Sequence, residues 1–333
     1  MEDINEKQEE LSEKKEIELF SKNEVEDYGN RDLSKPVRSY MPSAFISAAL
    51  PLRDVKKSCF SRKYNNISLY LTGAPKVPFG VYGRLLLSIL TTHAVVDKKT
   101  DKGTVVIRYD NIQTLVDEML VEKQRGKKVI EQLELFAKSS FIFEEKLKER
   151  VSKSLFPEFE SDDTNFKATW HSYGNMPFLE GFRYLTLEDS TGNKKNISFE
   201  VVLNEKFVKL CENHSVPIDY SVYSQISSPL GKDLYAWFVY RNNSLDTDKP
   251  LFIPRKSLVE QFMPVGEGAK DKKAMERNNY NLIKERVEEI KEKYYPHLDV
   301  TFDKDGNGMT LHRSPNVIST EEKRYMLVTS LGK

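Results

Sequence analysis

The chain has 333 residues, of which 31% are charged, and its basic and acidic side chains balance to a formal net charge of zero. This length allows two domains that each bury a core. No apolar run reaches the ~18 residues of a membrane helix, and the first residues are acidic and polar, so we expect a soluble, intracellular protein. Only Cys59 and Cys211 are present, neither of them near a second Cys or in a His-rich metal spacing, which argues against a disulfide framework and a zinc site.

The zero net charge hides an asymmetry along the chain. Residues 1–27 contain eleven Asp or Glu and four Lys, so the rest of the chain carries a net charge of +7. Residues 1–38 are rich in Glu and Lys with few apolar positions, a composition typical of disorder. We therefore expect a disordered acidic segment over 1–38, followed by a body whose charge suits an anionic partner.

The first half of the body predicts a helix, a strand, two helices and then strands. The spacing of apolar residues and the turn residues place these elements. After a strand at 67–71, they are expected at 81–96, 104–108, 110–120 with Asp110 as the N-cap, 129–136 after the basic turn 125–128, 141–143, 182–187 and 197–203. A polar insertion occupies 149–175. A linking helix at 204–213 is expected to end before Pro217.

The second half repeats this order without detectable sequence identity to the first. Its elements are expected at 230–240, 251–253, 256–262, 272–294 after a Gly-rich loop at 265–268, 298–302 and 309–312. Helix, strand, helix, helix and hairpin is the order of a winged helix. We therefore predict an α+β protein with two tandem winged-helix domains, at 39–203 and 204–318, and a tail at 319–333.

The long helix predicted at 272–294 has an apolar stripe and a polar face. The stripe is formed by Tyr280, Ile283, Val287, Ile290 and Tyr294, which recur at steps of three and four. In a helix–turn–helix the second helix enters the major groove of DNA, where Arg pairs with guanine and Asn with adenine. The alternative to a DNA-contacting role is that this polar face is an ordinary solvated helix surface.

The candidate DNA-contacting residues lie around the second helix of each predicted helix–turn–helix. Those expected to meet base edges are Arg277, Asn278 and Asn281. Those expected to meet phosphates, with the remaining basic candidates, are Lys270, Lys272, Lys273, Lys284, Lys304 in the hairpin wing, Arg313, and Arg125, Lys127 and Lys128 in the first domain.

Other chemistry is weakly supported by the sequence. Residues 303–308 resemble the start of an EF-hand loop, but its twelfth position is Ser314 instead of Glu and strands flank it, so we expect a hairpin turn. The sequence has no Walker-type phosphate loop and no assignable catalytic triad. We therefore expect no enzyme activity, catalytic residues, cofactor or metal.

Several longer strings resemble the RepA family of plasmid replication initiators. They occur within residues 48–318, at 77–80, 84–87, 90–95, 216–219, 228–237, 253–254 and 312–315. The insertion at 149–175, the acidic N-terminus and the placement of basic residues in the first domain depart from the family pattern.

The resemblance implies a bacterial cytoplasmic protein that binds repeated double-stranded DNA sequences in a plasmid origin. It also implies opening of the duplex, recruitment of host replication proteins such as an initiator and a helicase, control of copy number, repression of its own promoter, and a homodimer in exchange with monomer. Sheet edges at 141–143 and 182–203 are candidates for pairing between subunits. The alternatives are a winged-helix repressor without initiator activity and a primase-like enzyme.

Overall fold

The structure is a computed structural model that describes residues 36–64, 67–152, 165–188, 190, 194–245, 249–266 and 268–319. Nearly all of the predicted acidic segment at 1–38 and of the tail at 319–333 therefore lies outside the described residues. Val37 is 6% exposed and belongs to the core, and its amide donates to Asp219 Oδ1 at 3.0 Å. A truncation that preserves the fold must therefore stop before residue 37.

The first module has the strand order of a winged helix. Its elements are α3 (Gly80–Val96), β4 (Val105–Tyr109), α4 (Ile112–Glu118), α5 (Gly126–Ala137), β7 (Leu179–Glu188) and β8 (Lys194–Leu203). The antiparallel sheet runs β4-β8-β7, so the strand between the helices pairs with the second strand of the hairpin. The predicted order of elements is confirmed, and their ends shift by a few residues.

The second module repeats this arrangement. Its elements are α8 (Pro229–Ser244), β10 (Leu251–Pro254), α9 (Arg255–Phe262), α10 (Lys272–Glu289), β11 (Val300–Phe302) and β12 (Gly308–Leu311). The sheet order β10-β12-β11 matches that of the first module. The predicted fold class, α+β with tandem winged helices, is therefore confirmed by topology. The run 303–308 forms the turn between β11 and β12 at 303–307, with Gly306 at φ +73°, and Gly308 is the first residue of β12.

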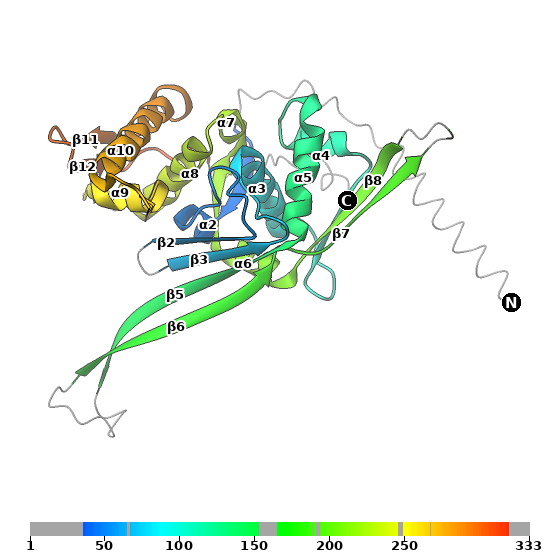
Figure 1. The fold of residues 1–333 in the computed structure, drawn as a ribbon, viewed down its shortest axis with the longest axis horizontal. Coiled ribbons are helices and arrows are strands. Elements are labelled where there is room, and N and C mark those ends of the chain that lie inside the picture. The colour runs from blue at the N-terminus through cyan, green and yellow to red at the C-terminus, as the bar shows by residue number, and fades with distance from the viewer. Residues whose placement is uncertain are drawn as a thin grey trace.

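A further sheet carries an arm that projects from the body. Strands β2 (Cys59–Tyr64), β3 (Ile67–Gly73), β5 (Ser139–Ser152) and β6 (Asn165–Pro177) form an antiparallel sheet in the order β2-β3-β5-β6. Pairing of β3 with β5 ends at Ile67 and Glu145, whereas β5 and β6 stay paired out to Ser152 and Asn165. Beyond β3 they form a two-stranded ribbon, at the lower left of Figure 1. Both ends of the predicted insertion at 149–175 are thus strand.

A two-stranded ribbon and short helices connect the modules. Strand β1 (Arg38–Pro42) pairs with β9 (Ser215–Asp219), α2 (Ser43–Ser47) follows β1, and α6 (Glu205–His214) and α7 (Tyr220–Gln225) flank β9. One continuous hydrophobic cluster extends through both modules. It includes Trp237 and Tyr235, which are 1% and 0% exposed, as predicted. The modules therefore share a core across their junction.

The structure corrects three local expectations. The N-cap of α4 is Asn111 and not Asp110, because Asn111 is extended and its side chain accepts from the Thr114 amide at 3.1 Å. Strand β5 is flanked by β3 and β6, so residues 141–143 offer no free edge. After α10, one turn of π-helix at 290–294 inserts an extra residue, so that Tyr295, rather than Tyr294, is buried at 4% exposure.

Candidate nucleic-acid interface

Helix α10 presents a polar, mostly basic face at its N-terminal half. Its inner face is formed by Tyr280, Ile283 and Val287, which are 4%, 0% and 0% exposed, as the apolar stripe predicted. The side chain of Asp271 caps the helix by accepting from the Ala274 amide at 2.9 Å. With the inner face buried and the start fixed by this cap, the opposite face is held toward solvent.

All the candidate residues predicted on and before α10 lie on that solvent side. They are exposed in the structure: Lys270, Lys272, Lys273, Arg277, Asn278, Asn281 and Lys284. Within the described part of the chain, none of these five cations forms an ion pair, whereas Arg255 and Arg286 are paired with carboxylates. Exposed cations that form no ion pair, on or just before a rigid helix, can contact an anionic partner.

The two lysines that follow the Asp271 cap of α10 lie where the helix dipole disfavours cations. The positive end of the dipole at a helix N-terminus favours Asp and Glu there, and cations destabilise it. The first turn of α10 nevertheless carries Lys272 and Lys273 and no acidic residue. The same holds for α5, which carries Lys127 and Lys128 in its first turn, again with no acidic residue. Each cation there weakens its helix, and a bound anion such as phosphate would reverse that effect.

Helix α5 offers fewer free groups than α10. Lys127 is exposed and, among the described residues, unpaired. Lys128 Nζ lies 5.9 Å from the centroid of the Tyr82 ring, and Arg125 Nε is bound to Glu122 Oε2 at 3.0 Å. The inner face is formed by buried apolar side chains: Val129, Leu133, Leu135 and Phe136. The first module thus presents lysines but few side chains that could read bases.

The hairpin wing of the second module is tied firmly to α10. The Tyr280 hydroxyl donates to the Gly308 carbonyl at 2.8 Å, and Lys284 Nζ lies 5.2 Å from the centroid of the Phe302 ring. Lys304 is exposed at the tip, as predicted, but Asp303 and Asp305 flank it in the sequence. These carboxylates weaken the attraction of the wing for phosphate.

Two further observations adjust the candidate set. Arg313 is exposed, yet its Nη1 donates to the Leu245 carbonyl at 3.0 Å, which ties β12 to the end of α8 and occupies part of the guanidinium. Lys256, in the first turn of α9, was not among the predicted residues, and its side chain is 80% exposed. Its position at the start of the helix before α10 could have indicated Lys256 as a further candidate for DNA contact.

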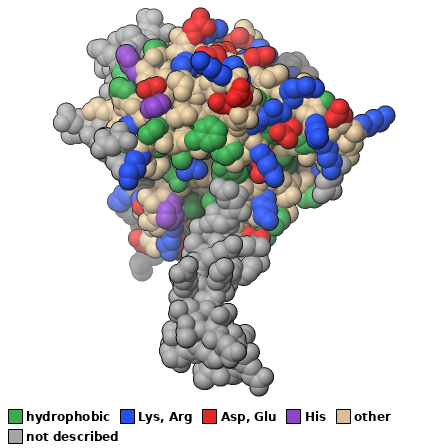
Figure 2. Space-filling model, turned by 90° about the vertical axis from the view of Figure 1, so that its left-hand side faces the viewer, with side chains coloured by type: hydrophobic (Ala, Val, Ile, Leu, Met, Phe, Trp, Pro, Cys, Tyr) green, Lys and Arg blue, Asp and Glu red, His purple; other side chains and the backbone are tan. Residues whose placement is uncertain are grey.

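The face of the molecule at the left of Figure 1 is rich in charge. Figure 2 shows that Lys and Arg side chains gather on the right-hand side of this face, with Asp and Glu side chains among them. No helix in the described part of the chain is long and apolar enough to cross a membrane. No group of three or more His, Cys, Asp or Glu among the same residues could hold a metal ion.

Comparisons with known proteins gave structural likenesses only. No family model matches the chain, and no curated protein matches it. A structure of domains 2 and 3 of RctB has a TM-score of 0.48 and 13% identity, covering 83% of this chain and 99% of that chain. A second structure of the same RctB domains has a TM-score of 0.44 and 12% identity, covering 80% and 94%. The Pi initiator protein in complex with iteron DNA has a TM-score of 0.41 and 13% identity, covering 84% and 96%. Because all three TM-scores lie below 0.5, the assignment of winged helices rests on the strand order of the two sheets.

Proposed function

We propose that this chain is a DNA-binding initiator of plasmid replication that binds repeated double-stranded sequences in an origin. The observation that carries the proposal is the start of helix α10, where unpaired lysines oppose the helix dipole and Arg277, Asn278 and Asn281 follow on the same exposed side. In a winged helix this is the helix that enters the major groove. The DNA supplies both the phosphates and the base edges that these side chains fit.

The two modules contribute differently in this proposal. Helix α10 carries side chains that can read bases, so the second module supplies sequence specificity. Helix α5 presents Lys127 and Lys128, so the first module adds phosphate contacts that set affinity and salt dependence. One chain would then cover two adjacent stretches of duplex, with sequence read mainly in one of them.

The resemblance to RepA initiators supports the finer parts of the proposal. These parts are opening of the duplex, recruitment of host replication proteins, control of copy number and repression of its own promoter. The proposal also includes a homodimer in exchange with monomer. Strand β7 lies at the edge of its sheet and exposes Tyr184 and Leu185 at 51% and 53%, which supports pairing of this edge between two copies.

Footprinting the purified full chain on DNA that flanks its own gene tests the proposal. We expect protection of several directly repeated sequences, and we expect a plasmid carrying them to depend on the protein for its maintenance. Protection of a single palindrome, with no effect on plasmid maintenance, would identify a repressor instead. Primer synthesis on a single-stranded template would identify a primase. Binding that shows no sequence preference at physiological salt would refute the proposal.

A further inference from the structure

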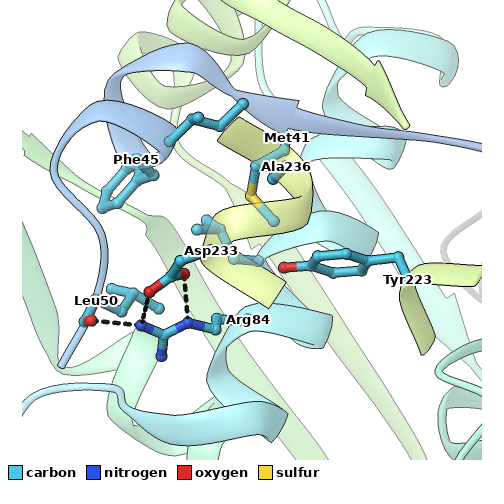
Figure 3. Close-up of a pocket in the computed structure, with 9 residues that line it drawn as sticks. Met41, Phe45, Leu50, Arg84, Tyr223, Asp233 and Ala236 are labelled. Atoms are coloured by element: carbon cyan, nitrogen blue, oxygen red, sulfur yellow. Dashed lines mark hydrogen bonds and ion pairs between the residues drawn. The ribbon is translucent and has the colours of Figure 1, made fainter. Parts of the chain in front are cut away.

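A buried ion pair joins the first helices of the two modules. Arg84 on α3 and Asp233 on α8 are 149 positions apart in the chain, yet both oxygens of the carboxylate lie 2.6 Å from guanidinium nitrogens. Their side chains are 2% and 7% exposed. Figure 3 shows the guanidinium facing the carboxylate, with the Leu50 carbonyl beside the terminal nitrogen that also bonds Asp233.

Every donor direction of this guanidinium is occupied. Besides the two bonds to Asp233, Nη1 donates to the carbonyls of Pro51 and Gly80 at 2.9 and 3.0 Å, and Nη2 donates to the Leu50 carbonyl at 2.6 Å. Because the guanidinium is a rigid planar fork, these bonds fix the position of the carboxylate in distance and direction. The start of α8 is thereby fixed against the start of α3 and the segment that follows α2.

The pair stands where it can control both DNA-facing helices. Helix α3 packs against α5, and α8 packs against α10. A change in the angle between α3 and α8 would therefore move α5 relative to α10. The ribbon β1–β9 also lies at the junction: β1 packs against α3 and β9 against α8. The Ser39 hydroxyl of β1 makes hydrogen bonds of 2.7 Å with the hydroxyls of Ser88 and Thr92 on α3. The ion pair adds a separate, bidentate contact that joins α3 directly to α8 and limits rotation of one helix against the other.

The apolar contacts at the junction lack this directionality. Phe45 and Ile46 of α2 are buried at 3% each, and α2 packs against α8. Apolar contacts hold surfaces together but tolerate small sliding movements. A buried ion pair adds little stability relative to apolar residues of similar volume, and its best-attested role is to specify one arrangement.

A second buried guanidinium keeps this region positive. Arg62 on β2 is 8% exposed, and its Nε and Nη1 find no hydrogen-bond partner among the described residues. Arg62 and Arg84 both act electrostatically with Asp233. Removing Asp233 alone would leave both buried cations uncompensated. Exchanging the pair together leaves only Arg62 without the carboxylate, and the Arg84→Lys variant keeps Asp233 beside both cations.

We propose that the Arg84–Asp233 pair is a positioning element that fixes the separation and angle of α5 and α10, and so the number of base pairs between the DNA segments that the two modules contact. This inference rests on the proposed function for its DNA readout. Its geometric content concerns the junction alone and can be measured without DNA.

The geometric test measures the distance between two spin labels, one on each module, by pulsed electron–electron double resonance. Spin labels are placed at Lys138→Cys, next to α5, and Glu288→Cys, on α10, in the full chain with Cys59→Ser. Cys211 stays unlabelled because it is fully buried and burial raises the pKa of its thiol. The parent should give one narrow distance, and the double variant Arg84→Met/Asp233→Leu should give a shifted or broader distribution.

Two further variants keep the geometric test decisive. Lys232→Met is the matched control, because Lys232 is also a buried basic residue of α8, but its Nζ donates to the Tyr223 and Ser224 carbonyls of α7 and not to α3. It should keep the parent distance. If the double variant does not fold, Arg84→Lys retains the charge but loses the fork and should still broaden the distribution. A narrow parent-like distance in the folded double variant, or in Arg84→Lys, would overturn the proposal.

The DNA readout selects duplexes from a random pool with the parent and with the double variant. The parent should select two motifs at one separation. The double variant should select the same motifs at several separations and bind the parent's preferred duplex about tenfold more weakly, because a looser link lowers the effective concentration of the second module. An unchanged single separation would overturn the proposal. If the parent selects no motif, the proposed function fails, while the distance measurement still decides the role of the pair.

Discussion

Changing His93 to Gln should remove a pH-dependent contribution to folding stability. His93 lies in α3 and is fully buried among ionisable groups of the first module. Its Nδ1 is 2.8 Å from Asp97 Oδ2, and its Nε2 is 3.1 Å from the Tyr109 hydroxyl and 3.5 Å from Glu118 Oε2. Burial alone disfavours the charged imidazole, but the hydrogen bonds and charges of Asp97 and Glu118 outweigh it and raise the pKa of His93 to about 9.

The size and sign of the effect follow from this shift. The folded state holds a proton on His93 up to about pH 9, whereas an unfolded His releases it near pH 6.5. The stabilisation is therefore fully present below pH 6.5 and is lost as the pH rises through 9. A shift of this size corresponds to about 3 kcal/mol of unfolding free energy. Tyr109 does not ionise in this range, because burial raises its pKa well above 10.

Urea unfolding of the parent and of His93→Gln at pH 6, 7.5 and 9.5 measures the effect. The difference in unfolding free energy between the two proteins should shrink by about 3 kcal/mol from the lowest to the highest pH. Ser88→Ala is the matched control: Ser88 is a buried polar residue of the same helix that does not titrate, so its cost should stay constant. A difference between parent and His93→Gln that is the same at all three pH values would refute this reasoning.

Four further predictions concern the interface and the fold. Lys273→Glu should stabilise α10 by about 0.3–1 kcal/mol in thermal unfolding while weakening binding to every duplex, and a parallel loss of both would contradict the dipole argument. Arg277→Ala should cost about 1–3 kcal/mol on the specific duplex and leave binding to a scrambled duplex unchanged, as measured by titration at several salt concentrations. Gly308→Ala should destabilise the fold by about 1–3 kcal/mol, because its new Cβ would lie 2.2 Å from the Ile253 carbonyl oxygen; an unchanged melting temperature would show that the backbone can relax there. Deleting residues 146–171 and closing the ribbon with an Asn-Gly turn should leave the melting temperature unchanged, because pairing with β3 ends before this segment; a large drop would show that the arm supports the body.

The repeated order of helices and strands could be predicted because patterns of neighbouring residues indicate each element. The stripe of Tyr280, Ile283 and Val287 follows the helical period, and the Asp-Gly and Asn-Gly pairs mark the turn of the second hairpin. Such signals need only neighbouring residues. They also placed the exposed cations of α10 correctly on the solvent side.

Features that depend on distant pairing could not be predicted. Strand β1 pairs with β9, Arg38 opposite Asp219, and nothing in either segment indicates the other. The arm was missed because most of residues 149–175 are polar and predict a solvated insertion. The alternation of Phe166, Ala168 and Trp170 with polar residues was the signal that could have indicated a strand. The π-turn at 290–294 was missed because both Tyr294 and Tyr295 are apolar enough to fit the stripe.

Charged side chains occur in two different settings in the two modules. At the starts of α5 and α10, cations stand where the helix dipole disfavours them, and those on α10 have no ion-pair partner among the described residues. At the junction, by contrast, Arg84 is buried with all its donors satisfied. Unsatisfied charge at the surface is useful only if a partner of opposite sign arrives, whereas satisfied charge inside specifies one arrangement of the chain. A protein that must place two positive helix ends at a fixed separation along one polyanion needs both kinds of charge. The structure places the exposed cations on α5 and α10 and the buried pair on α3 and α8, the helices against which α5 and α10 pack.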